Sequence, residues 1–191
     1  LGLASSQAAA KYDLAQVFSV GTAEAIVERG LHNVFRFTPG VNKITAVAMD
    51  NLKLLNDGAG NPVKTAAIIH EDGPFGSSMA DLIEKTLPDQ GITVVERIPH
   101  PTPHRDFNNI ALRVKASRAD IIIPSNYLNE YTLMTRALQQ QRVELMAIYS
   151  VLGGAASNIR FVRENNDVAQ YVIDCNHWYD PKKEASQALA A

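Results

Sequence analysis

Short apolar runs alternate with longer amphipathic stretches along almost the whole chain, and this alternation restricts the fold more than any other property of the sequence. The clearest run, Thr65 to Ile69, is followed by a turn-rich loop and then by Met79, Leu82 and Ile83, which recur at helical spacing. Repeated strand–helix units build a mostly parallel sheet that helices cover on both faces. The pattern therefore predicts the α/β class, as a parallel-rich three-layer sandwich.

The same alternation continues toward the end of the chain. We expect further strands at residues 92–98, 120–123, 145–149 and 171–175, with helices over residues 107–114 and 128–138. A serine caps the helix that begins at residue 77, and Gly91 ends it. These elements predict a parallel-rich sheet within residues 38–178.

The first part of the chain contains fewer elements. The expected ones are a helix capped by Ser5 and Ser6 that runs to Asp13, a strand at 16–20, a short helix after Gly21 and Thr22, and a strand at 33–37. Two strands cannot make an independent domain. A helix over residues 41–55 and a turn-rich loop at 56–62 join this part to the strand at Thr65.

The composition excludes several classes of partner and site. Eighteen Lys and Arg residues against 20 Asp and Glu residues give a net charge of -2. No basic block supplies the face that charge-driven binding of nucleic acid requires, so we expect no nucleic-acid partner. The single cysteine, Cys175, excludes an internal disulfide and a clustered-thiolate zinc site. No run approaches the ~18 consecutive apolar residues that span a bilayer.

Two loops at predicted strand ends carry groups suited to a ligand. The loop of residues 71–78 opens a helix, so its N–H groups could receive an anion, but it lacks the lysine and the glycine spacing of a P-loop. The alternative is a plain turn with Phe75 packed beneath it. The loop of residues 124–127 offers a hydroxyl, an amide and the ring of Tyr127, which suit a small ligand with a polar head. The alternative there is a helix cap with Tyr127 on the surface.

The remaining candidates are weaker. The glycine-rich loop of residues 149–157 permits close backbone approach or is a plain strand-to-helix turn. His100 and His104 have the spacing of zinc ligands on a helix, but two intervening prolines prevent that helix, so we expect no metal site. No catalytic constellation can be singled out, so we expect no enzyme activity and no catalytic residue. His177 and Trp178 either line a cleft or belong to the core.

Several segments, taken in chain order, match the pattern of one known family. They are Gly21 to Ala23 before Glu28 to Gly30, Asn33 to Pro39, Ala66 to Asp72 with Phe75 and Gly76, Asp106 and Phe107 before Asp120 to Ile123, Tyr131 to Gln140, and Tyr179 to Pro181. In this order they resemble the leucine/isoleucine/valine-type substrate-binding proteins of ABC transporters, also called type I periplasmic binding proteins. The resemblance spans nearly the whole chain.

Members of that family have two α/β lobes that a hinge joins and that close around a ligand. The resemblance implies that residues 1–37 are part of lobe one, that residues 38–178 form a nearly complete lobe two, and that residues 179–191 begin the return to lobe one. A chain with an incomplete first lobe would expose a sheet edge and an apolar face. Association, including a swapped dimer, is then expected.

The resemblance also assigns residues to a ligand site. They are Ser5, Ser6, Thr22, Ala23, Phe75, Tyr127 and Val151. In amino-acid-binding relatives, lobe one holds the ligand carboxylate and lobe two adds aromatic rings. Val151 falls where such relatives carry the acid that receives the ligand ammonium, so an α-amino acid would require Glu71 or Asp72 instead. An amide or an organic or aromatic acid is the alternative ligand.

The function that the resemblance implies is the solute-binding component of an ABC importer. Such a protein is not an enzyme, needs no cofactor, captures a small organic ligand and delivers it to a membrane permease. It is periplasmic, and either soluble or tethered at the membrane surface. The same fold serves as the ligand sensor of receptors and of amide-responsive regulators, which is the alternative function.

Overall fold

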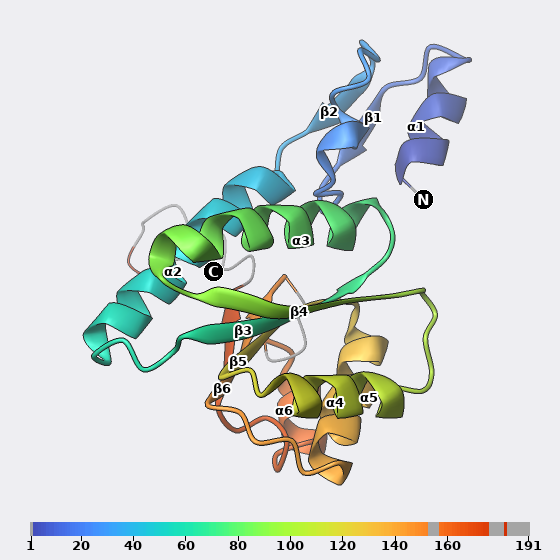
Figure 1. The fold of residues 1–191 in the computed structure, drawn as a ribbon. Helices are drawn as coiled ribbons and strands as arrows, with labels where there is room; N and C mark the ends of the chain where they lie inside the picture. The colour runs from blue at the N-terminus through green and yellow to red at the C-terminus, as the bar shows by residue number, and fades with distance from the viewer. Residues whose placement is uncertain (1, 153–156, 176–181, 183–191) are drawn as a thin grey trace.

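The computed structural model describes residues 2–152, 157–175 and 182. Its main unit contains a five-stranded sheet with the order β4-β3-β5-β6-β7 (Figure 1), and every pair of neighbouring strands is parallel. The strands are β3 (Thr65–Glu71), β4 (Thr93–His100), β5 (Ile121–Ser125), β6 (Ala147–Val151) and β7 (Val172–Cys175). The predicted α/β class and its parallel sheet are confirmed.

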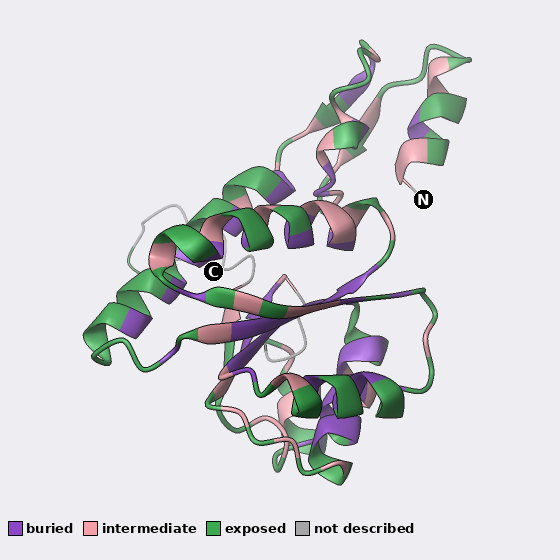
Figure 2. Cartoon of the chain, viewed as in Figure 1, coloured by how far each residue is buried: buried purple, intermediate pink, exposed green. Residues whose placement is uncertain are grey.

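Helices cover both faces of this sheet (Figure 1). The helices on one face are α2 (Val41–Gly58) and α3 (Pro74–Thr86), and those on the other are α4 (Asn108–Ser117), α5 (Leu128–Gln140) and α6 (Ile159–Glu164). Because successive side chains of a strand point to opposite faces, β3 buries Ile68 in one core and Ile69 in the other. Each such buried side chain contributes about 1.5–3 kcal/mol. Figure 2 shows the buried residues along the strands and on the helix sides that face them.

The first part of the chain lies apart from this sheet (Figure 1). It consists of α1 (Gly2–Ala10), β1 (Gln16–Phe18), the 3-10 helix η1 (Glu24–Ile26) and β2 (Val34–Arg36). The strands β1 and β2 form their own parallel two-stranded sheet. Ala23, Ile26 and Val34 make a small core here, whereas Val17 and Phe35, which pair across the two strands, are exposed.

The helix starts differ from those predicted. Gly73 precedes α3 and Pro74 lies in its first turn, while Ser77 donates its hydroxyl to the Asp72 carbonyl at 3.2 Å. The helix α1 already begins at Gly2, and the hydroxyls of Ser5 and Ser6 donate back to the Gly2 carbonyl at 3.2 and 2.7 Å. The predicted serine caps are therefore wrong, because a serine inside a helix bonds the carbonyl about one turn behind it.

Other helix ends also differ. The helix α3 stops at Thr86 and continues as the 3-10 helix η2 (Leu87–Gln90), which Gly91 ends at a φ of 73°. The sequence did not predict α6, whose Asn158 cap accepts the Arg160 N–H at 2.9 Å. None of the helices in residues 2–152, 157–175 and 182 has both the length and the apolar character needed to cross a membrane.

Part of the sequence-based interpretation falls outside the described residues. This concerns the glycines of the loop at 153–156, the residues His177 and Trp178, and the segment from Tyr179 to Pro181.

Candidate functional site

An open cavity of about 930 Å³ lies where the first part of the chain faces the main unit. Its lining is mostly apolar and comes from both parts of the chain. The residues are Gly2, Leu3, Phe18, Val20, Gly21, Thr22, Ala23, Ile26, Glu71, Pro74, Phe75, Thr102, Tyr127, Leu128 and Leu152. Those of the main unit end or follow β3, β4, β5 and β6, so the cavity lies at the carboxyl ends of the parallel strands.

Two aromatic rings form one wall of this cavity. Phe75 follows β3 and Tyr127 follows β5, and these two strands are neighbours in the sheet. Their ring centroids lie 5.7 Å apart with the planes tilted by 32°. Burial, together with the nearby carboxylates of Glu71 and Glu130, raises the pKa of the Tyr127 phenol. The hydroxyl therefore stays protonated at neutral pH and can donate a hydrogen bond.

Glu71 holds the loop that carries Phe75. Its two carboxylate oxygens accept the N–H groups of Gly73 and Gly76, each at 2.6 Å, so the loop closes over a buried side chain. A Cβ atom at Gly76 would collide with the Glu71 backbone. Glu71 is also the one charged side chain among the described residues that line the cavity.

The opposite wall is formed by the segment before η1. Thr22 and Ala23 both line the cavity and are themselves mostly buried. The Thr22 carbonyl accepts the N–H of Val41 at 2.9 Å and a guanidinium N–H of Arg36 at 3.0 Å. This wall is thus tied to the first residue of α2.

The remaining predicted site residues do not line the cavity. Ser6 is fully buried, with its hydroxyl bonded to the Gly2 carbonyl and contacted by Arg29, and Ser5 accepts an N–H of Gln16 at 2.8 Å. Val151 lies in the core between the sheet and α2, although its neighbour Leu152 reaches the cavity. The assignment of these three residues to a ligand stays a prediction.

Sequence reasoning missed several residues of the lining. No motif or spacing in the sequence around Leu3, Phe18 or Thr102 predicts a ligand site. Each of them reaches the cavity only through the way its segment packs in the fold. Thr102 lies in the loop between His100 and His104, whose rings are 5.5 Å apart. Burial lowers the pKa of His100, and the described residues hold no group of three or more His, Cys, Asp or Glu side chains arranged around a metal position.

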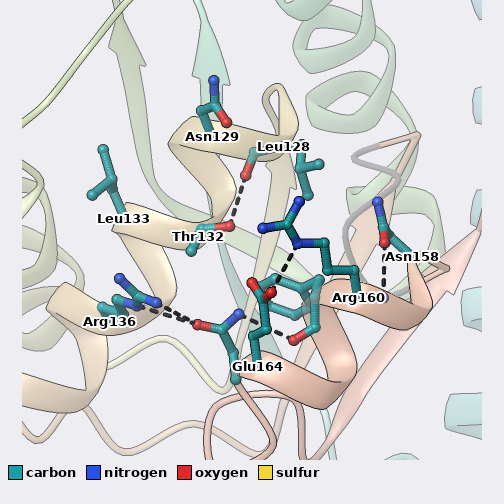
Figure 3. A pocket seen from close by; sticks show the side chains of 10 residues that line it. Leu128, Asn129, Thr132, Leu133, Arg136, Asn158, Arg160 and Glu164 are labelled. Carbon is teal, nitrogen blue, oxygen red and sulfur yellow. Dashed lines mark hydrogen bonds and ion pairs between the residues drawn. The ribbon is translucent and has the colours of Figure 1, made fainter.

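A second, smaller hollow of about 490 Å³ lies between α5 and α6 (Figure 3). Arg136 donates two hydrogen bonds to the side-chain oxygen of Asn165, at 3.2 and 2.9 Å, and Arg160 pairs with Glu164 at 2.8 Å. The polar groups of this hollow are therefore mainly bonded to one another.

The main unit and the strand pair beside it enclose an open, mainly apolar cavity, and this arrangement is suited to a small ligand. The chain belongs to the periplasmic binding protein family, because the sequence model of that family matches residues 1–191. This confirms the resemblance stated from the sequence. The proteins that it matches are substrate-binding proteins and not enzymes, and membership of this family implies an extracytoplasmic location.

Curated relatives and solved structures agree with this assignment. The Leu/Ile/Val-binding protein BraC3 of Rhizobium johnstonii is 30% identical over 192 residues, which cover 97% of this chain and 50% of that protein. Leu/Ile/Val-binding protein homolog 8 of Brucella abortus is 26% identical over 164 residues, covering 84% of this chain and 41% of that protein. The chain thus spans half or less of the length of these two relatives.

The fold has solved counterparts. An amino acid ABC transporter substrate-binding protein from Pseudomonas fluorescens Pf-5 superposes with a TM-score of 0.75 at 17% identity, covering 98% of this chain and 49% of that one. An ABC transporter solute-binding protein from R. palustris, in complex with 4-hydroxybenzoate, superposes with a TM-score of 0.66 at 20% identity, covering 78% of this chain and 39% of that one. At these identities the likeness concerns the fold.

Proposed function

We propose that this chain belongs to the solute-binding component of an ABC importer and that the 930 Å³ cavity holds its small organic ligand. The observation that carries the proposal is the shared lining of the cavity: Thr22 and Ala23 come from the first part of the chain, and Phe75 and Tyr127 from the main unit. A ligand that touches both parts links them, and this is the requirement for capture by closure. We also propose that the protein is periplasmic and delivers its ligand to a permease in the membrane.

The proposed lobes follow the sequence-based boundaries. Residues 1–37 are part of lobe one, residues 38–178 are lobe two, and residues 179–191 begin the return. The separate sheet of β1 and β2 supports the first boundary, since α2 starts only at Val41 and packs on the five-stranded sheet.

The lining favours a ligand with an apolar body and a polar head. Phe18, Phe75 and Leu128 offer apolar surface, whereas the hydroxyls of Thr22 and Tyr127 can bond a polar group. Relatives are named for leucine, isoleucine and valine, and one solved structure holds 4-hydroxybenzoate. The compounds to be tested as ligands are therefore a panel of branched-chain amino acids, their amides and aromatic acids.

The test is isothermal titration calorimetry of this panel against the present chain and against a version extended to two complete lobes. We expect the extended protein to bind at least one compound, and the present chain to bind it at least tenfold more weakly, because contacts from the rest of lobe one are missing. Equally tight binding by both would show that the site lies within one lobe.

The matched variants are Tyr127→Ala and Tyr171→Ala in the extended protein. Tyr127 lines the cavity, whereas Tyr171 is 78% exposed and does not line it. Loss of the Tyr127 ring should weaken binding about tenfold, and Tyr171→Ala should leave the affinity unchanged. An unchanged affinity in Tyr127→Ala would remove the cavity from the proposal.

A further inference from the structure

An ion pair lies against the crossing between the two parts of the chain. The chain passes from β2 to α2 through residues 37–40, and the guanidinium of Arg36 meets the carboxylate of Glu24 at 2.5 Å beside this crossing. The Arg36 side chain is 10% exposed and that of Glu24 is 19% exposed. Because little water screens these two charges, they attract each other more strongly than the charges of an exposed surface pair.

The arginine side of the pair binds the cavity wall. Arg36 donates from one guanidinium nitrogen to the carbonyl of Thr22 at 3.0 Å and to the carbonyl of Ala23 at 3.2 Å. Both of these residues line the cavity, while Arg36 itself does not. Arg36 therefore acts on the wall through the backbone and not by touching a ligand.

The glutamate side of the pair binds α2. The second carboxylate oxygen of Glu24 accepts the N–H of Asn42 at 3.0 Å, in the first turn of the helix. The neighbouring Val41 donates its N–H to the Thr22 carbonyl at 2.9 Å, and its side chain is completely buried against the five-stranded sheet. The pair thus connects the wall to an element that is anchored in the main unit.

The backbone at Gly40 is fitted to this arrangement. A Cβ atom added there would collide with the Glu24 carboxylate and with the Arg36 guanidinium. Burial alone would raise the pKa of Glu24, but the bonds from Arg36 and from the Asn42 N–H outweigh that effect, and its pKa lies below the ordinary value. The carboxylate is therefore ionised at neutral pH and the pair is complete.

We propose that Glu24 and Arg36 form a positioning latch, which fixes the wall of Thr22 and Ala23 relative to α2 and hence relative to the rings of Phe75 and Tyr127. Its role in ligand binding rests on the function proposed above. Its role in holding the two parts of the chain does not, since it follows from the contacts at the crossing alone.

The first test measures the distance between the two parts by pulsed electron spin resonance in the present chain. Spin labels replace Ala8 on α1 and Lys85 on α3, both exposed, in a Cys175→Ser background. Arg36→Gln should broaden the distance distribution, and Arg36→Lys, which keeps the charge but not the forked geometry, should restore part of its sharpness. Arg113→Gln, which removes the Arg113–Glu96 pair of the main unit, should leave it unchanged.

A second label pair, at Lys85 and Lys115, lies wholly within the main unit and reports whether that unit stays folded. We expect its distribution to be the same in all variants. If Arg36→Gln leaves both distributions as sharp as in the parent chain, the latch is disproved. If Arg36→Gln broadens both, the ion pair supports the main unit and is not a latch.

The ligand test uses the two-lobed protein. Arg36→Gln and Glu24→Gln should each weaken binding about tenfold, mainly through faster dissociation, while Arg113→Gln does not. Unchanged affinity in both variants would overturn the role of the latch in binding. If the parent protein binds no compound of the panel, the proposed function fails, whereas the spin-label distances still decide whether the pair holds the crossing.

Discussion

Glu71 illustrates how a single residue shapes the candidate site. Its carboxylate accepts the N–H groups on both sides of Phe75, so that the ring both packs against the core and faces the cavity. The sequence offered either a ligand loop or a plain turn over Phe75. It could not decide between them, because the fold of this loop depends on Glu71 turning back onto its own backbone.

His100 predicts how stability depends on pH. It is 2% exposed and packs edge-on against Phe107, and one ring nitrogen donates to the Pro101 carbonyl at 2.9 Å. Burial is the main cause of its lowered pKa. The bond to the Pro101 carbonyl and the charge of Glu130 raise the pKa, and the nearby His104 and His70 lower it further. Because the unfolded chain keeps the ordinary value of 6.5, it binds more protons than the folded chain as the pH falls through this value. The folded state should therefore lose stability below about pH 6.5.

The measurement is the free energy of unfolding in urea at pH values above and below about 6.5. His100→Gln should reduce the slope of the unfolding free energy against pH, whereas His32→Gln, at an exposed position, should retain it. An identical slope in the parent chain and in His100→Gln would contradict this explanation.

At the scale of elements, the strands were the most predictable part of the fold. Residues 121–123 are all apolar and all buried, because helices cover both faces of the sheet. A continuous apolar run of this kind predicts a buried parallel strand from the sequence alone. The helix α6 was missed, because it has only six residues, of which three are charged and only Phe161 is buried, so it gives no helical stripe. The helix starts were mistaken because Ser5 and Ser6 lie inside α1 and because Gly73, and not a serine, precedes α3.

Asp120 connects two of these elements. One of its carboxylate oxygens accepts the N–H of Lys64 at 2.8 Å and both the N–H and the hydroxyl of Thr65, at 2.8 and 2.9 Å, so the starts of β5 and β3 are held together. Asp120→Ala should lower the unfolding free energy by about 1–3 kcal/mol, because these donors lose their partner. Asp50→Ala, on the exposed side of α2, should change it by less than about 0.5 kcal/mol in urea unfolding. Equal effects of the two variants would show that this connection contributes little.

At the scale of the whole molecule, the sequence predicted the family but only part of the cavity. Thr22, Ala23, Phe75 and Tyr127 line it, and all four are residues that the resemblance assigned to a ligand site. Leu3 and Phe18 were not predicted, because they join the lining only when α1 and β1 pack beside η1.

The two-stranded sheet of β1 and β2 exposes apolar side chains on one side. Val17 is 63% and its partner Phe35 is 54% exposed, and two strands give this apolar surface little cover. The expected association of this chain, including a swapped dimer, stays a prediction, and its oligomeric state in solution is the measurement that tests it.

The central claim is that one ligand contacts both parts of the chain in the cavity between them. The direct measurement is two-dimensional NMR of the isotope-labelled chain with the compound that calorimetry selects. We predict that the amide signals of Thr22 and Ala23 shift together with those of Phe75 and Tyr127, with one common saturation curve. Shifts confined to one of these two groups, or to Arg136 and Asn165 in the hollow between α5 and α6, would contradict the claim.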